Sequence, residues 1–286
     1  MTTLAYYPGC SLHGTSAELD RSFRASMQAL DIELAEIPGW ECCGNTAAHS
    51  ASRLLAIALP ANELVKVGRD MGLDSVAVPC AACFSRFMAA EHELAADEQV
   101  RREVELVVGR NVPTGIKILN LVDVYHDAVG LQRFKAKVTR PLGGLKVAAY
   151  YGCLLTRPPK VTLAEDPECP TRMDDVLRAL GAAPVQWSYK TDCCGASLAL
   201  CEQSIVIELV RRIVADARAC GAEAIVAACP LCQINLDSRQ LDIKAKDPAW
   251  QPLPVVFLSQ LVGHAVGVPA GQLGWNKHLT AVPSLS

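Results

Sequence analysis

Aromatic residues are scarce in this chain of 286 residues, in which Phe, Trp and Tyr together make up 5%. Apolar residues nevertheless make up 51%, so Ala, Val and Leu must fill the interior, as they do in α/β folds. Long apolar runs are also missing, since no segment has the roughly 18 uninterrupted apolar residues that a membrane helix needs. No secretory leader pattern is found, and we therefore expect a soluble, cytoplasmic protein.

An excess of one charge and nucleotide-binding motifs are lacking as well. The formal net charge is −3 and no long basic run occurs, which argues against nucleic acid as a partner. No Gly-x-Gly-x-x-Gly follows a strand and no phosphate loop is found, so no flavin or nucleotide is expected in this chain. A ferredoxin-type cysteine run is missing too, and electrons must therefore come from, or go to, another protein.

Cysteine, in contrast, is abundant, and ten of the 13 cysteines fall into one pattern that occurs twice. The first set comprises Cys10, Cys42, Cys43, Cys80 and Cys83, and the second set comprises Cys153, Cys193, Cys194, Cys229 and Cys232. In each set a Cys-Cys-Gly triplet lies between a single cysteine and a Cys-x-x-Cys pair. Each set has five thiols, one more than a tetrahedral zinc ion or a cubane iron–sulfur cluster requires.

The constant order of the two sets indicates duplication of a unit of about 140 residues. The halves also begin alike, because Leu4–Cys10 resembles Val147–Cys153. The sequence therefore predicts an N-terminal domain over residues 1–140, a C-terminal domain over 145–270 and a tail over 271–286. The seam is expected in the basic segment Phe134–Leu145.

Each half has the pattern of four short apolar strands that alternate with helices. The expected strands are Leu4–Tyr7, Glu33–Ile37, Ser75–Val78 and Ile116–Leu119, then Leu145–Tyr150, Pro184–Trp187, Ala224–Ala227 and Pro254–Phe257. This alternation predicts parallel sheets with right-handed crossovers. The expected fold class is α/β, with two duplicated domains related by a pseudo-two-fold axis, each a small, mostly parallel sheet flanked by helices.

Three helices are expected in particular. One follows the capping-box spacing of Thr15 and Glu18 and runs to Leu30. A second is a long helix over Ala196–Ala219, and a third is expected to begin near Cys83.

The predicted strands bring the cysteines of each set together. Ligands of an open parallel sheet collect beyond the carboxyl ends of its strands. Cys10, the Cys42-Cys43 pair and Cys80 follow the first, second and third strands, and the second set repeats this order. For adjacent cysteines to share one site the chain must turn, and Gly44 and Gly195 supply the freedom to do so.

Several interpretations of these thiols remain open on residue chemistry alone. Four zinc ligands are available in each half, so structural zinc is possible. A secreted disulfide framework is disfavoured by the length and helix content, and buried inert thiols do not explain the repeat. Iron–sulfur clusters are favoured, although coordination rules leave the fifth thiol unexplained.

The doubled arrangement Cys-x(31–39)-Cys-Cys-Gly-x(34–36)-Cys-x-x-Cys resembles the cysteine-rich CCG domains in the B subunit of heterodisulfide reductase. The likeness extends beyond the cysteines. Tyr7–Ser11 looks like the start of that protein, and Tyr150–Pro158 and Cys229–Asp237 look like its second-domain signatures. The resemblance covers the chain to about Gly267.

The resemblance implies a noncubane [4Fe–4S] cluster in each half, held by the five thiolates of each set, with zinc in one domain as an alternative. It also implies that the paired clusters cleave a disulfide between the two domains. The implied partners are the iron–sulfur C subunit and the flavin-containing A subunit of such a complex.

The leading hypothesis is therefore the catalytic B subunit of a heterodisulfide-reductase-like complex. Its substrate would be a disulfide or thiol, or lipoate-bound sulfur as in sulfur-oxidising bacteria. The alternatives are an electron-transfer component of a respiratory dehydrogenase and a zinc-stabilised scaffold.

A few other residues are candidates for narrower roles. His13 and His49 are weak proton-donor candidates because they follow cysteines closely and histidine titrates near neutral pH. Arg157 is a candidate for attracting an anionic substrate, and Trp275 for a packing or partner contact. Cys169, Cys201 and Cys220 have no counterparts in the other half and are expected to be ordinary buried or semi-buried thiols.

Overall fold

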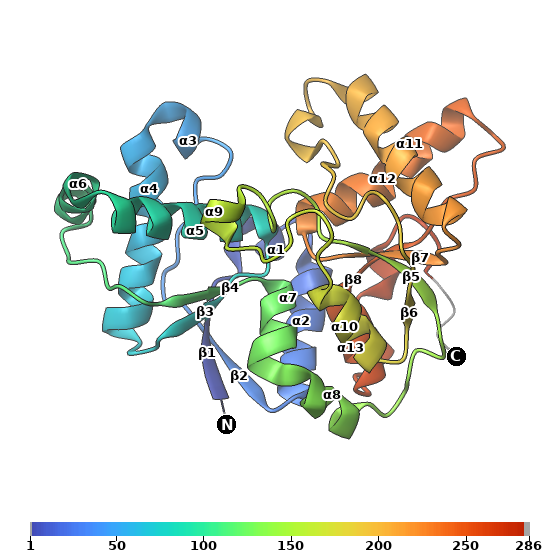
Figure 1. Cartoon of the computed structure of the whole chain (residues 1–286), viewed down its shortest axis with the longest axis horizontal. Helices are drawn as coiled ribbons and strands as arrows, with labels where there is room; N and C mark the ends of the chain where they lie inside the picture. Colours follow the sequence, from blue (N-terminus) through green and yellow to red (C-terminus); the bar gives the residue numbers. More distant parts are fainter. Residues whose placement is uncertain (1, 283–286) are drawn as a thin grey trace.

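The computed structural model describes residues 2–282 and contains two four-stranded sheets in which every pair of neighbours is parallel (Figure 1). The first sheet has the order β2-β1-β3-β4, and the second has the equivalent order β6-β5-β7-β8. The strands are β1 (Thr2–Tyr6), β2 (Ile32–Glu36), β3 (Ser75–Ala77), β4 (Lys117–Leu119), β5 (Lys146–Tyr150), β6 (Ala183–Pro184), β7 (Ala224–Ala227) and β8 (Val255–Phe257). The predicted fold class is confirmed, and all eight expected strands are present.

Helices connect the strands and flank the sheets. In the first half they are α1 (Gly9–His13), α2 (Ala17–Ala29), α3 (Ala48–Ala51), α4 (Arg53–Val65), the π-helix η1 (Lys66–Asp70), α5 (Ala81–Ala96), α6 (Glu98–Val108), α7 (Leu121–Asp123), the π-helix η2 (Val124–Gly130) and α8 (Leu131–Lys137). In the second half they are α9 (Pro159–Thr162), α10 (Arg172–Ala179), α11 (Gln203–Ala219), α12 (Pro230–Lys246) and α13 (Leu258–Ala265), with short 3-10 turns η3 (Ala196–Leu198), η4 (Ala270–Gln272) and η5 (Trp275–Lys277). No helix within residues 2–282 combines the length and the apolar character needed to cross a membrane.

The predicted helix over Ala196–Ala219 is wrong in its first part. Residues 196–202 form the short turn η3 and a loop, and α11 begins only at Gln203. The cause is local, because Gly195 lies in the left-handed region with φ +77° and directs the chain over the neighbouring thiols. Leu200 is consequently 98% exposed rather than packed on a helix face.

The predicted capping box at Thr15 and Glu18 does not form. The N-cap of α2 is Ser16, and no side chain caps the helix. Glu18 is buried, and this burial raises the pKa of its carboxyl group. Burial of Glu18 against the rest of the fold has therefore displaced the local interaction that the spacing favours.

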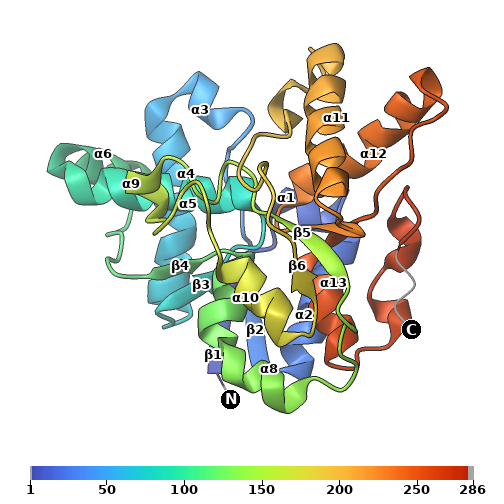
Figure 2. The same cartoon turned by 45° about the vertical axis from the view of Figure 1, so that its right-hand side comes forward.

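Helices are packed reciprocally across the two halves. Helix α2, which follows β1, packs on α13 of the second half, and the equivalent helix α10 packs on α7, η2 and α8 of the first half. Helices α2, α10 and α13 lie side by side in the lower middle of the molecule in both views, with α8 at its bottom edge (Figure 1 and Figure 2). Ser22 of α2 and Ser259 of α13 share a buried hydrogen bond with their hydroxyl oxygens 2.7 Å apart. This reciprocal packing gives the molecule its pseudo-two-fold arrangement.

The buried apolar residues of both halves form one continuous core. It contains both sheets, α2, α10 and α13, with Phe23, Met27, Leu177 and Leu261 fully buried. A smaller cluster lies under α4, α5 and α6, around Ala61. The interior therefore extends without a break across the seam between the halves.

The segment after η5 is fixed to α12 by a buried carboxylate. Asp237 Oδ1 accepts hydrogen bonds from the Thr280 amide at 2.9 Å and the Thr280 hydroxyl at 2.6 Å, and Oδ2 accepts one from the Leu279 amide at 2.8 Å. The neighbouring His278 is buried, and burial lowers the pKa of its imidazole, so that it is held neutral. Much of the predicted tail is thus docked on the fold.

We predict that Asp237→Ala lowers the free energy of unfolding by about 2 to 4 kcal/mol, because it leaves two buried donors of Thr280 and the partly buried Leu279 amide without an acceptor. Asp242→Ala is the matched control, since Asp242 lies on the same helix and makes a partly exposed ion pair with Arg239. Its loss should stay below about 0.5 kcal/mol. Chemical denaturation of both variants measures the difference, and equal losses would contradict the anchoring role.

Candidate functional site

Both cysteine sets lie beyond the carboxyl ends of the strands, as the strand pattern predicts. In the first half Cys10 follows β1, the Cys42-Cys43 pair follows β2, and Cys80 follows β3 as the N-cap of α5. The strand order places β1 beside β3 with their onward connections leaving in opposite directions, which is the position where α/β sheets bind ligands. Cys153 follows β5 and Cys229 is the N-cap of α12, in the equivalent places.

The two sets have the same internal arrangement. The second cysteine of each Cys-Cys pair contacts the last cysteine of its set, with Sγ–Sγ distances of 3.2 Å for Cys43–Cys83 and 3.6 Å for Cys194–Cys232. The first cysteine of each pair is hydrogen-bonded to the single cysteine, as Cys42 is to Cys10 and Cys193 is to Cys153. Residues distant in sequence therefore form one thiol network in each half.

The two networks meet at a single contact. Cys80 and Cys229 are both buried, and the interaction between their thiols raises the pKa of Cys80 and lowers that of Cys229. Each is the N-cap of a long helix, so two helix N-termini point at the same place. Helix N-termini carry partial positive charge and favour anionic groups such as thiolates.

Hydrogen bonds between the thiols favour a thiolate at certain positions. The bond with Cys153 lowers the pKa of Cys193 to about 6, and the bond with Cys83 lowers that of Cys43 to about 7. The bond with Cys232 lowers the pKa of Cys229. Since the thiolate is the form that binds metal, each half has donors that are ready to do so near neutral pH.

Two glycines that the sequence analysis gave no role keep space for the last thiol of each set. Gly9 has φ +67°, and a Cβ there would lie 3.2 Å from Cys83 Sγ. Gly152 has φ +69°, and its Cβ would lie 3.1 Å from Cys232 Sγ. The backbone before the single cysteine therefore passes directly against the Cys-x-x-Cys pair.

Two tyrosines, also missed from the sequence, hold the Cys-Cys pair in position. The Tyr7 hydroxyl donates to the Glu41 carbonyl oxygen at 2.7 Å, and the Tyr150 hydroxyl donates to the Asp192 carbonyl oxygen at 2.6 Å. Glu41 and Asp192 immediately precede the two pairs. The repeated Tyr-x-Gly-Cys spacing was the signal, because the same three residue types recur at the same offsets from Cys10 and Cys153.

The predicted turn at the Cys-Cys-Gly triplets is confirmed. Gly44 has φ +74° and Gly195 has φ +77°. At Gly44 a Cβ would also come within 2.5 Å of the Ala48 Cβ, so the turn is tightly packed as well as left-handed. Each pair of adjacent cysteines can thus face one site.

A cavity of about 580 Å³ opens on the second set, and all five of its cysteines line it. Leu154, Leu200 and Leu231 add apolar surface on the same side. The opposite wall belongs to the first half and is formed by Asn45, Thr46, His49, Ser50, Ala81 and Arg86. None of the first set's cysteines lines this cavity, so the two sites are not equivalent toward a small molecule.

The two histidine candidates lie in different surroundings. His49 lines the cavity. His13 does not, and it instead packs edge-on against Trp40 with ring centroids 4.9 Å apart and lies 3.7 Å from Glu36. Only His49 is brought near the second thiol set.

The expectation for the three cysteines outside the two sets is wrong. Cys169, Cys201 and Cys220 are exposed rather than buried or semi-buried, because all three lie in surface connections or at a helix end. The Arg157 guanidinium donates to the Glu168 carboxylate at 2.6 Å and to the Thr191 carbonyl oxygen at 2.8 Å, so it connects two loops. Trp275 packs against the core, as one of its two expected roles requires.

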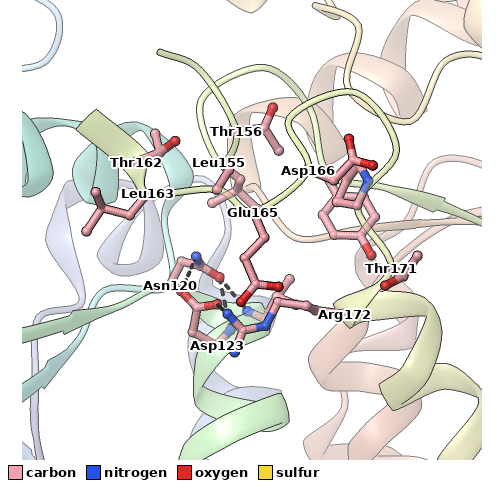
Figure 3. A pocket seen from close by; sticks show the side chains of 14 residues that line it. Asn120, Asp123, Leu155, Thr156, Thr162, Leu163, Glu165, Asp166, Thr171 and Arg172 are labelled. Atoms are coloured by element: carbon pink, nitrogen blue, oxygen red, sulfur yellow. Dashed lines mark hydrogen bonds and ion pairs between the residues drawn. The ribbon is translucent and has the colours of Figure 1, made fainter. Parts of the chain in front are cut away.

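A second, smaller pocket of about 110 Å³ lies where α10 meets the end of the first half (Figure 3). Arg172 of α10 pairs there with Asp123 of α7 and with Asp127. Burial raises the pKa of Asp123 to about 6 despite this cation. The pocket contains no cysteine, and we assign it to the contact between the halves.

The donor chemistry of both sets fits a sulfur-ligated metal group. Each set offers five sulfur atoms, three of them buried in each half, and thiolates select zinc or iron–sulfur centres. In the part of the chain that the structure describes, no three Cys, His, Asp or Glu side chains are arranged to hold a single metal ion.

The fold and the doubled thiol site define a cysteine-rich protein built from two α/β halves. A family model described as CCG, a cysteine-rich domain, matches residues 4–88 and 147–237. The chain belongs to this family.

Curated relatives extend over nearly the whole chain. The chain is 33% identical to the 8-methylmenaquinol:fumarate reductase membrane anchor subunit of Wolinella succinogenes, over 96% of both chains. It is 28% identical to the B subunit of a ferredoxin/F420H2-dependent CoB-CoM heterodisulfide reductase of Methanosarcina acetivorans, over 96% of this chain and 92% of that protein. A crystal structure of a hypothetical protein from Helicobacter pylori matches with a TM-score of 0.75 at 13% identity. That match covers 99% of this chain and about half (52%) of the other, and it supports the fold alone.

We predict that Gly9→Ala and Gly152→Ala each lower the metal content of their own half, because the new methyl group crowds the last thiol of the set. Gly39→Ala is the matched control, since Gly39 has φ +55° but no atom within 4 Å of its Cβ position. All three variants carry the left-handed strain of about 1 kcal/mol, so only crowding distinguishes them. Iron and zinc analysis after anaerobic reconstitution measures the effect, and equal metal loss in the Gly39 variant would refute it.

Proposed function

We propose that this chain is the catalytic B subunit of a heterodisulfide-reductase-like complex, and that it carries out disulfide/thiol redox chemistry with two noncubane [4Fe–4S] clusters. The cysteines of the first set would hold one cluster, and those of the second set would hold the other. When bound, each cluster supplies one electron at a time, so that the pair matches a two-electron disulfide reaction. The CCG family membership and the similarity to a heterodisulfide reductase component support this proposal.

The contact between Cys80 and Cys229 is the observation that carries the proposal. Two separate structural metal sites have no need to touch. Here the networks meet through buried thiols at the junction of the halves, as expected for two redox centres that serve one substrate.

The chain's own residues give this site three further properties. The cavity at the second set admits a small molecule to the thiols, and its apolar side excludes part of the water. His49 stands on the opposite wall as the candidate proton donor to a departing thiolate. The buried Tyr150 hydroxyl bond holds the Cys193-Cys194 pair in place.

Partner proteins complete the proposed reaction. We propose an iron–sulfur C subunit and a flavin-containing A subunit, because the sequence itself has no flavin or ferredoxin motif. The substrate would be a disulfide or thiol, or sulfur bound to a lipoate-carrying protein.

Replacement of one thiol in the second set tests the cluster assignment. Cys193→Ala should remove about half of the iron from anaerobically purified protein, because one of the two five-thiol sets is then incomplete. Cys220→Ala should leave the iron unchanged, since Cys220 is an exposed thiol outside both sets. An unchanged iron content in the Cys193 variant would refute the assignment of a cluster to the second set. Stoichiometric zinc without visible absorbance would favour the zinc-stabilised scaffold.

Electron transfer without a disulfide substrate is the second candidate. The relative at 33% identity, which is named as part of a menaquinol:fumarate reductase, favours it. In that case the chain would pass electrons between partners in a respiratory complex.

Exposure of the oxidised, cluster-loaded protein to a small thiol, followed by paramagnetic resonance, separates the two candidates. A signal that depends on the thiol is expected for the disulfide chemistry, because the substrate sulfur must reach the redox centre. A spectrum that is the same with and without thiol would favour electron transfer.

A further inference from the structure

Arg86 is an unpaired cation on the wall of the cavity that faces the second thiol set. It lies on α5, three residues after Cys83, and is half-buried. Its Nε is fully buried and has no hydrogen-bond partner. Within residues 2–282, Arg86 makes no ion pair, whereas most arginines of the chain do. Since Arg86 also makes no hydrogen bond in this part of the chain, its guanidinium charge is not neutralised by any side chain and is available to a group in the cavity.

The residue at the position of Arg86 is different in the other half. Its counterpart, three residues after Cys232, is Asn235, whose amide donates to the Cys194 carbonyl oxygen at 2.6 Å. Asn235 thus serves its own half. Arg86 instead lines the cavity of the other half, and no such hydrogen bond fixes it. The duplication has therefore placed a cation where symmetry alone would have put a structural amide.

The charge of the cavity wall is one-sided. Among the described residues, no Asp or Glu lines the cavity, and the first half contributes Arg86 together with polar groups such as Asn45 and Ser50. The opposite wall is mostly sulfur and apolar carbon, with Tyr151 and Ser197 as its uncharged polar residues. Arg86 also lies within electrostatic reach of the first set: its charge adds to the effect of the Cys83 hydrogen bond that lowers the pKa of Cys43.

We infer that Arg86 is a specificity residue that binds an anionic group of the substrate, such as a carboxylate, sulfonate or phosphate, while the sulfur end faces the cysteines of the second half. This inference rests on the proposed function and names its substrate class as an anionic organic thiol or disulfide. Arginine suits this role because its planar fork pairs with such groups through charge-assisted hydrogen bonds.

Alkylation of the metal-free, full-length chain tests the inference with two reagents that differ only in charge. The Cys193 thiolate displaces iodide from either iodoacetate or neutral iodoacetamide, and a carbon–sulfur bond forms in each case. The ratio of the two rates cancels the nucleophilicity of the thiolate and reports the local preference for an anion. Mass spectrometry follows Cys193 and, as an internal reference outside the cavity, the exposed Cys220.

Arg86→Gln should lower the iodoacetate-to-iodoacetamide ratio at Cys193 by about tenfold, in line with the loss of one charge-assisted hydrogen bond. The ratio at Cys220 should not change. Arg86→Lys should keep most of the preference, because the charge remains. Arg212→Gln is the matched control, since Arg212 is exposed and pairs with Glu208.

An unchanged iodoacetate-to-iodoacetamide ratio at Cys193 in Arg86→Gln would overturn the inference, even if both rates had fallen. Circular dichroism shows whether the variant is folded, and Arg86→Lys keeps the test decisive if the Gln variant is not. A failure of the proposed function appears separately, as missing iron or a missing thiol-dependent signal, and leaves this ratio unaffected.

Discussion

Every strand of both sheets runs parallel to its neighbours, and this constraint brings ten cysteines from distant parts of the chain to two adjoining edges. A parallel sheet has all its carboxyl ends on one side, so any residue placed just after a strand arrives at the same edge. Cys10, Cys80, Cys153 and Cys229 are such residues. The helix N-termini that begin at Cys80 and Cys229 then add positive potential where the thiolates gather. The thiol networks, the glycine contacts and the cavity all follow from this placement.

The two sites are alike in the contacts among their own residues and differ in the residues that surround them. The contact between the second cysteine of the pair and the last cysteine, the hydrogen bonds of Tyr7 and Tyr150 and the close approach of Gly9 and Gly152 occur in both halves. The surroundings are not repeated, because the cavity faces the second set and its far wall is taken from the first half. One half thus presents a reactive edge, and the other supplies the polar surface opposite to it.

The sequence was sufficient for the strands and for the grouping of the cysteines, because both depend on local pattern and on strand direction. It was insufficient where tertiary contacts decide. The loop over residues 196–202 has helical composition but must pass over the thiols, and Glu18 gives up its capping role because it is buried. The roles of Gly9 and Tyr7 were visible only as a repeated spacing. Arg86 and Asn235 occupy equivalent positions, and their different partners follow from packing across the halves.

The reciprocal packing of α2 on α13 and of α10 on η2 has a consequence for how such a molecule is built. Each half places α2 or the equivalent α10 on the C-terminal helices of the other half, so neither half buries these surfaces alone. An interface of this kind is isologous, the form that two identical subunits adopt around a two-fold axis. The chain is therefore equivalent to a homodimer whose subunits have been joined end to end through the segment 138–145. Once the two copies are joined in one chain, their sequences can differ. A residue such as Arg86 can then occur on one side of the pseudo-two-fold axis alone, with Asn235 at the equivalent position on the other side.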